Sequence, residues 1–279
     1  MDEIGAPLPW RPTPLIVGVV AVHPLALLVA LAQPTLWPWA LAAVLAGHLL
    51  ITAASLWPRG PWLGPNLVRL PAESRARGEV ALSFDDGPDP EVTPAVLDLL
   101  DAHGVRATFF CIGERARAHP ALCRAIVQGG HAVENHSNRH RHNFSLLGPC
   151  GYARELRAAQ RTLSSITGTT PRFFRAPAGL RNPFLGPVLA RQNLLLASWT
   201  RRGFDTRETR PAVVLQRLLR KLRPGDILLL HDGHAARTAQ GRPVILDVLP
   251  PLLDAIRSAN LTPVTLRAAY ALPATPYRP

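Results

Sequence analysis

Val80-Ala-Leu-Ser-Phe-Asp-Asp-Gly-Pro88 is a short apolar run that ends in two adjacent carboxylates and a Gly-Pro turn. An apolar run of this length, bounded by turn residues, predicts a buried β-strand. Its carboxyl end then carries Asp85 and Asp86. Taken alone, the two carboxylates are equally well explained as a capped turn after a strand, so we looked for similar patterns along the rest of the chain.

Six further apolar segments follow and predict strands at Thr108–Cys111, Ala132–Glu134, Arg172–Arg175, Leu195–Trp199, Ile227–Leu230 and Pro263–Leu266. Segments with helical periodicity separate most of them, at Pro94–His103, Ala116–Gln128, Tyr152–Ile166, Ala212–Leu222 and Val244–Ala259. We expect Thr93 to cap the first of these helices. Strand–helix alternation predicts a parallel sheet covered by helices. The predicted fold class is therefore α/β, a distorted, seven-stranded (β/α) barrel.

Polar side chains gather where the predicted strands end. Asp85 and Asp86 end the first strand, and His136 and His140 follow the third. The fourth, fifth and sixth strands end at or next to Arg175, Trp199 and His231. In barrels of this kind the carboxyl ends of the strands meet at one mouth, where active sites are built. The sequence therefore predicts a catalytic site at that mouth.

His136 and His140 are four residues apart, so both imidazoles can reach one metal ion. Asp86 offers a carboxylate oxygen as a third ligand. Three protein ligands leave a position for water, as in catalytic zinc sites. Such an ion lowers the pKa of its water to about 7, and the adjacent Asp85 is available as a base. The histidine spacing alone is common by chance, so the prediction depends on all of these residues together.

Five motifs, in order, resemble those of the polysaccharide deacetylase family, the NodB homology or carbohydrate esterase family four group. They are Leu82–Pro88, His136–His140, Arg175–Gly179, Trp199 with Asp205, and Leu228–Asp232. The resemblance extends from about Glu79 to Leu266. It implies a distorted barrel, a divalent metal (most simply zinc), and a hydrolase that removes an acetyl or formyl group from the nitrogen of an amino sugar.

The resemblance also implies a role for each matching residue. The metal ligands are Asp86, His136 and His140, the base is Asp85, the acid is His231, and the residues that hold base and acid are Arg175 and Asp205. The backbone N–H of Ala178 would stabilise the oxyanion, and Leu229 would line the pocket for the acyl methyl group. Pro177 and Trp199 lie in the same motifs and are expected beside the substrate.

Two positions depart from the family pattern. Ala178 stands where the family usually has an aromatic residue, and Thr206 stands where a tryptophan often follows the second aspartate of the fourth motif. These changes leave the predicted chemistry intact but remove side chains that would support a sugar. An open subsite favours a lipid-linked or formylated sugar over a long polymer. The alternatives that remain are an esterase acting on O-acyl groups and a silent protein that binds glycan or lipid.

Two apolar runs, Pro14–Ala32 and Leu36–Trp57, precede the predicted barrel. Each has the roughly 20 residues that cross about 30 Å of hydrocarbon. Tryptophans lie near their ends, at Trp10, Trp37, Trp39, Trp57 and Trp62. We predict a transmembrane hairpin over residues 1–60, a linker over 61–78 and the catalytic domain over 79–279. The alternative is a signal peptide cleaved after Ala32, followed by one anchor.

The formal charge is +12, and arginine supplies nearly all of the positive charge. These arginines are scattered and form no aromatic-interleaved stripe, which argues against nucleic acid as a partner. The expected partners are membrane lipid and an acylated amino-sugar glycan or lipid-linked sugar. Arginines, beginning with Arg59, follow the second run, whereas the turn between the runs is uncharged. The positive-inside rule then predicts a multi-pass protein of a bacterial-type inner membrane with a cytoplasmic catalytic domain.

Overall fold

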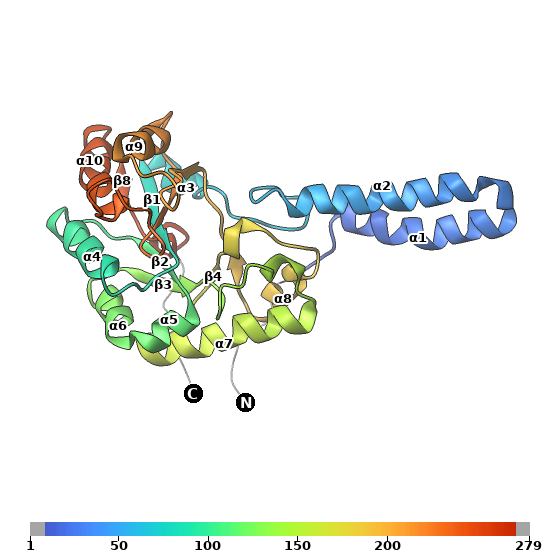
Figure 1. Ribbon diagram of the computed structural model, residues 1–279, viewed down its shortest axis with the longest axis horizontal. Helices are drawn as coiled ribbons and strands as arrows, with labels where there is room; N and C mark the ends of the chain where they lie inside the picture. The colour runs from blue at the N-terminus through green and yellow to red at the C-terminus, as the bar shows by residue number, and fades with distance from the viewer. Residues whose placement is uncertain (1–8, 272–279) are drawn as a thin grey trace.

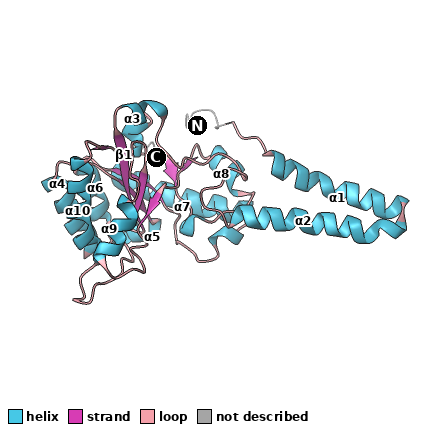
Figure 2. Cartoon of the chain, turned by 90° about the horizontal axis from the view of Figure 1, so that it is seen from above, coloured by secondary structure: helices cyan, strands magenta, loops and turns pink. Residues whose placement is uncertain are grey.

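The computed structural model of the chain describes residues 9–271. Residues 1–8 and 272–279, at the outer ends of the predicted hairpin and catalytic segments, lie outside the described residues. A rounded α/β body carries the sheet, and a pair of long antiparallel helices projects from one side of it (Figures 1 and 2).

Within residues 9–271, the sheet strands are β1 (Glu79–Asp85), β2 (Thr108–Cys111), β3 (Ala132–Asn135), β4 (Phe173–Phe174), β5 (Leu195–Leu196), β6 (Arg201–Arg202), β7 (Ile227–His231) and β8 (Thr262–Pro263). Seven of them follow the order β5-β4-β3-β2-β1-β7-β6, and β8 pairs with the start of β1. All pairs are parallel. The seven strands curl into a half-barrel, which confirms the predicted α/β class.

The helices of the body are α3 (Ala72–Ala76), α4 (Val92–Ala102), α5 (Gly113–Ala118), α6 (Pro120–Gln128), α7 (Pro149–Thr167), α8 (Leu185–Arg191), α9 (Pro211–Leu219), α10 (Val244–Ser258) and α11 (Leu266–Ala269). Short 3₁₀ turns lie at η1 (Pro34–Leu36), η2 (Phe144–Leu146) and η3 (Pro177–Gly179). On β1, Leu82 and Phe84 pack outward against the helices. Because side chains alternate along a strand, Ser83 and Asp85 point the other way, into the half-barrel. The strand period thus directs the reactive carboxylate inward.

The predicted fifth strand is divided. β5 ends at Leu196, and the chain then crosses to pair β6 with β7. Between them, Leu67 pairs with Ala197, and the N–H of Ser198 donates to the carbonyl of Leu67 at 2.9 Å. The segment around Leu67, which precedes the barrel, therefore forms backbone hydrogen bonds with residues 196–198 where a continuous fifth strand was predicted.

The other differences from prediction are local. The predicted helix Ala116–Gln128 is α5 and α6, because Pro120 lacks an N–H and keeps His119 out of the helical conformation. The predicted last strand ends at Pro263, because the Thr265 hydroxyl caps α11. Thr93 does not cap α4, which begins at Val92. Instead, its hydroxyl donates to Asp232 at 2.6 Å.

The predicted linker lies against the body. Leu63 and Leu70 are buried, and α3 forms within this segment. The guanidinium of Arg181, itself buried, donates to the carbonyl of Gly60 at 2.6 Å and to that of Gly64 at 3.2 Å. The residues between the long helices and β1 therefore form part of the packed structure.

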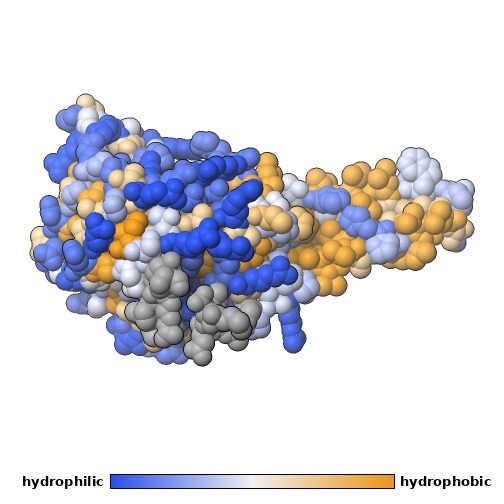
Figure 3. Space-filling model, turned by 90° about the horizontal axis from the view of Figure 1, so that it is seen from below, coloured by the Kyte–Doolittle hydropathy of each residue, from blue (hydrophilic) through white to orange (hydrophobic). Residues whose placement is uncertain are grey.

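Helices α1 (Pro14–Ala32) and α2 (Trp37–Ser55) pack against each other along their length. By length and composition, each is apolar enough to cross a membrane. Their surface is mostly hydrophobic, with a few hydrophilic side chains, whereas the body shown in Figure 3 is largely hydrophilic. His23 and His48 meet between the two helices, with 3.2 Å between their Nε2 atoms. The pair is the hairpin that the sequence predicts.

Candidate active site

The strand ends bring the predicted reactive residues together. Asp85 is the last residue of β1, and its register partner on the adjacent β7 is His231. On the other side, β3 ends at Asn135, next to His136, and pairs with β4, which ends one residue before Arg175. Parallel neighbours point their side chains in the same direction, so the sheet register itself assembles the site.

Asp86, His136 and His140 form one compact cluster. Nε2 of His136 lies 3.2 Å, and Nε2 of His140 lies 3.1 Å, from Oδ1 of Asp86. One ligand atom from each residue lies within 4.8 Å of the others. Asp86 and His140 adopt left-handed backbone conformations, with φ of 72° and 48°. Such conformations are costly for residues other than glycine and are frequent at functional sites.

Burial and neighbouring charges set the protonation of this cluster. Burial alone raises the pKa of Asp86, but the imidazoles of His136 and His234 outweigh it and hold the pKa well below its ordinary range. Burial, together with the neighbouring His136, lowers the pKa of His140 to about 4. Burial also lowers the pKa of His136, but Asp85 and Asp86 outweigh that effect and raise it. The carboxylate is thus ionised and His140 is neutral near pH 7.

Asp85 is held by a fully buried arginine. NH1 of Arg175 lies 2.7 Å from Oδ1 of Asp85 and 2.9 Å from Oγ of Ser83. The remaining guanidinium nitrogens donate to the carbonyls of Ala197 and Ser198, at 3.2 and 3.0 Å. Each of the three guanidinium nitrogens therefore donates at least one hydrogen bond, which fixes Arg175 and the carboxylate paired with it.

His231 is paired with Asp205. Its Nδ1 lies 2.9 Å from Oδ1 of Asp205, and its backbone N–H donates to Oδ2 at 2.7 Å. Burial lowers the pKa of His231, but the charge of Asp205 outweighs it and raises the pKa to about 9. The ring is therefore protonated at neutral pH, and its Nε2–H is available as a proton donor.

The predicted substrate residues lie in two places. Ala178 is exposed in the turn after Arg175 and has φ of 54°, whereas Pro177 is buried. Leu229 and Trp199 belong to the buried cluster inside the half-barrel. Trp199 also packs against the Ala178 turn, since a Cβ on Gly179 would come within 2.6 Å of its ring. The structure therefore joins the third and fourth motifs through this tryptophan.

The donor set fits a divalent metal ion. Oδ1 of Asp86 is buried and, among residues 9–271, accepts no hydrogen bond of good geometry, although two imidazole nitrogens face it. A buried carboxylate oxygen without a partner is costly. One carboxylate oxygen and two imidazole nitrogens are the ligand types that zinc prefers.

Three residues beside this cluster were not predicted. His234 lies 3.2 Å from Oδ2 of Asp86 through its Nδ1, and Arg115 contacts both His234 and the backbone of Asp86. Asp232 lies behind the Gly87 turn, and burial raises its pKa to about 7. In the sequence, Asp232 belongs to the fifth motif and His234 follows it by two residues, whereas Arg115 is 119 residues away from His234 and carries no such signal.

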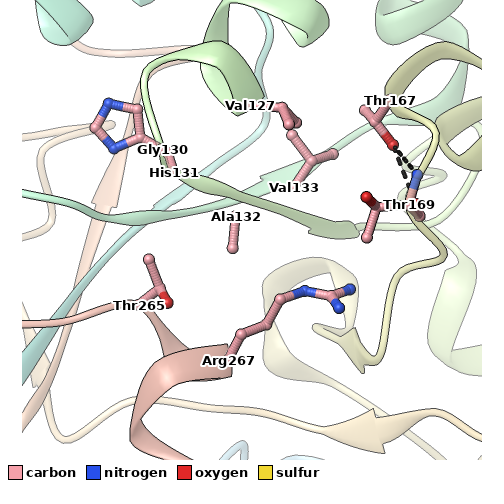
Figure 4. A pocket seen from close by; sticks show the side chains of 9 residues that line it. All are labelled: Val127, Gly130, His131, Ala132, Val133, Thr167, Thr169, Thr265 and Arg267. Carbon is pink, nitrogen blue, oxygen red and sulfur yellow. Dashed lines mark hydrogen bonds between the residues drawn. The ribbon is translucent and has the colours of Figure 1, made fainter. Parts of the chain in front are cut away.

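A separate hollow of about 200 Å³ lies at the opposite end of the strands. His131 and Ala132, at the start of β3, line it together with Thr265 and Arg267 (Figure 4). The guanidinium of Arg267 is already paired with Glu134 at 2.6 Å. None of the predicted catalytic residues lines this hollow, so we assign the active site to the mouth.

Comparisons with known proteins identify the family of the chain. Residues 72–194 match the family model described as polysaccharide deacetylase. A peptidoglycan-N-acetylglucosamine deacetylase of Bacillus cereus is 33% identical over 199 residues, which cover 70% of this chain and 69% of the relative. A chitooligosaccharide deacetylase of Sinorhizobium fredii is 36% identical over 168 residues, covering 59% and 76% of the two chains.

A solved structure is also similar. The family 4 carbohydrate esterase from Streptomyces lividans, determined in complex with acetate, superimposes with a TM-score of 0.60 at 31% identity. The match covers 67% of this chain and 91% of that one. Sequence, fold and the mouth of the half-barrel lead to the same conclusion: the chain belongs to the polysaccharide deacetylase family of hydrolases.

Proposed function

We propose that the protein hydrolyses the N-acyl group of an amino sugar, in a glycan or linked to a lipid, at a divalent metal ion, most simply zinc. One observation carries the proposal. Oδ1 of Asp86 is buried and has no hydrogen-bond partner among residues 9–271, and it faces the imidazole nitrogens of His136 and His140. These residues would hold the ion. When bound, it polarises the acyl carbonyl and makes a water molecule more acidic.

Asp85 is the general base in this proposal. Its Oδ2 faces the metal side of the site, 3.8 Å from Nε2 of His136, while its Oδ1 is held by Arg175. The free oxygen can therefore accept the proton of the attacking water. The buried ion pair with Arg175 fixes the orientation of the carboxylate, as general-base catalysis requires.

His231 is the general acid. The amine of an amide is a poor leaving group unless it is protonated as the C–N bond breaks. Asp205 holds Nδ1, so Nε2 carries the proton toward the mouth. This carboxylate–imidazole pairing orients the ring and stabilises its charged form.

Ala178 and Leu229 would contact the acyl group. The exposed turn at Ala178 presents its backbone N–H as a donor to the oxyanion. Leu229, opposite Ser83 on the neighbouring strand, would line the pocket for the acyl methyl group. Trp199 supports both the turn and the pocket.

The test is to purify the full-length protein in detergent and measure its zinc content and its release of acetate or formate from acylated amino-sugar substrates. We expect one zinc per chain and acid release, both lost in Asp86→Asn, whereas the exposed Asp254→Asn retains both. Folded wild-type protein without metal and without turnover would refute the proposal. Zinc without turnover, on both amide and O-acyl substrates, would favour a silent binding protein.

We further propose that the hairpin anchors the protein in a membrane and holds the mouth beside the bilayer. The carbonyl of Pro58, just beyond α2, accepts a hydrogen bond from Ser198 at 2.9 Å, and Arg59 donates to the carbonyl of Thr200 at 3.3 Å. A Cβ on Gly179 would lie 2.7 Å from Pro58. The root of the hairpin therefore packs directly against the loops around Trp199 and Ala178.

This arrangement favours a substrate that is itself in the membrane. The exposed Ala178 offers no aromatic side chain to a sugar chain, and the hairpin root fixes its turn close to the predicted bilayer. We expect an undecaprenyl-linked acylamino sugar to be hydrolysed faster than a chitin oligomer. A preference for the soluble oligomer in the same nanodisc preparation would contradict the lipid-linked substrate and leave the deacetylase chemistry standing.

Cys150 provides a test of orientation, because it is exposed while Cys111 and Cys123 are buried. A cytoplasmic catalytic domain predicts that a membrane-impermeant maleimide labels Cys150 only after the cells are lysed. Cys150→Ser is the control for background labelling. Labelling in intact cells would place the catalytic domain on the outer side of the membrane. A purified chain that begins after Ala32 would identify a cleaved signal peptide.

A further inference from the structure

We propose that Arg115 and His234 form a brace that reserves one oxygen of Asp86 for the metal ion and thereby raises metal affinity. Both are positioning residues, and the inference rests on the proposed metal site. No motif of the family resemblance contains Arg115, and His234 lies just after the last motif.

The two oxygens of Asp86 have different neighbours. Oδ1 faces Nε2 of His136 and of His140, at 3.2 and 3.1 Å. Oδ2 faces Nδ1 of His234, also at 3.2 Å. A carboxylate whose second oxygen is occupied binds a metal through one oxygen only, which suits a small tetrahedral ion such as zinc.

Arg115 fixes the tautomer of His234. NH2 of Arg115 lies 2.7 Å from Nε2 of His234. A guanidinium can only donate, so this Nε2 must accept and the ring proton must lie on Nδ1. The Nδ1–H then donates to Oδ2 of Asp86. His234 is thereby engaged on both nitrogens and is not a fourth metal ligand in this arrangement.

The other terminal nitrogen of Arg115, NH1, contacts the backbone of Asp86. It donates to the carbonyl oxygen of Asp86 at 2.9 Å. Gly233 lies against that carbonyl, and a Cβ at this position would overlap both the carbonyl and the guanidinium. Glycine thus allows the loop after β7 to reach Asp86, whose left-handed backbone (φ 72°) is held from two sides.

A group that hydrogen-bonds a metal-binding carboxylate orients it before the ion arrives, and removing such a group lowers metal affinity about 10–100-fold. We expect His234→Ala to weaken zinc binding by this factor, and Arg115→Ala to weaken it similarly. His234→Asn should retain most of the affinity, because the side-chain amide can donate to Oδ2 in place of Nδ1–H. The control is His142→Ala, which removes an exposed imidazole two residues from His140.

Affinity is measured on full-length protein in detergent by competition with a chromophoric zinc chelator, without any substrate. The absorption spectrum of the cobalt-loaded protein reports the coordination geometry, and circular dichroism of the metal-free variants verifies folding. Weaker binding in His234→Ala with rescue by His234→Asn supports the brace. Equal affinities of His234→Ala, His142→Ala and wild type overturn it while the metal site stands. Wild-type protein that binds no zinc overturns the metal site, and the brace with it.

Discussion

His140 and His231 lie at the same mouth of the half-barrel, and their surroundings shift their pKa values in opposite directions. His140 is partly buried beside another imidazole, and its pKa falls to about 4. His231 is more deeply buried but faces Asp205, and its pKa rises to about 9. A metal ligand must offer a lone pair, whereas a general acid must carry a proton. In the proposed mechanism the neighbouring groups therefore distinguish the two roles, because the residue type is the same.

Asp85 lies between the cluster of Asp86, His136 and His140 and the general acid proposed here, His231. It is the register partner of His231 on β7, and its Oδ2 is 3.8 Å from Nε2 of His136. Arg175 compensates its charge from within the half-barrel. Arg175 holds Oδ1, so Oδ2 is free to accept a proton on the metal side while His231 keeps its own on the other. In the proposed mechanism the site therefore has a base half, around Asp85, and an acid half, around His231.

The largest expected effect comes from removing the acid half. His231→Ala should lower kcat on an N-acyl substrate by ~10²–10⁴-fold, the usual range for losing a general acid. The loss should be much smaller on an O-acyl ester, whose alkoxide leaves more easily than an amine. Zinc content should not change, because His231 is not one of the metal ligands. Equal losses on amide and ester, or an unchanged rate on the amide, would remove His231 from the role of acid.

A smaller effect tests the source of the raised pKa. With Asp205→Asn, the pKa of His231 should fall from about 9 toward its ordinary value near 6.5. The acid form exists below this pKa, so activity is lost as pH rises through it, and the alkaline limb of the pH–rate profile should move to lower pH. At pH 8 we expect roughly a 10-fold or greater loss. Asp254→Asn, an exposed position, should leave the limb in place, and an unmoved limb in Asp205→Asn would locate the titrating group elsewhere.

Much of the arrangement of this candidate site could be predicted, because local sequence patterns determine where its side chains point. The alternation of Leu82 and Phe84 with Ser83 and Asp85 fixes which way the carboxylate points, and parallel strands bring distant motif residues to one mouth. The brace on Asp86 could not be predicted, because Arg115 lies in α5 and His234 in the loop after β7, and their contact depends on how α5 packs. The divided fifth strand depends likewise on Leu67, which precedes the barrel by more than ten residues.

The smallest expected effect concerns Asp232, whose carboxyl group is buried against the Gly87 turn. Burial raises its pKa to about 7, although the Thr93 hydroxyl donates to it. In the unfolded chain it ionises near 3.8. Between these values the folded protein holds a proton that the unfolded chain has lost, so this group makes the protein less stable as pH rises through that window. Asp232→Asn keeps the shape and cannot ionise. The Tm of the metal-free variant relative to metal-free wild type should therefore increase from pH 4 to pH 7, by about 2–4 °C for each kcal/mol. A difference that does not change with pH would mean that Asp232 is ionised throughout and that the polar contacts behind the Gly87 turn stabilise its charge.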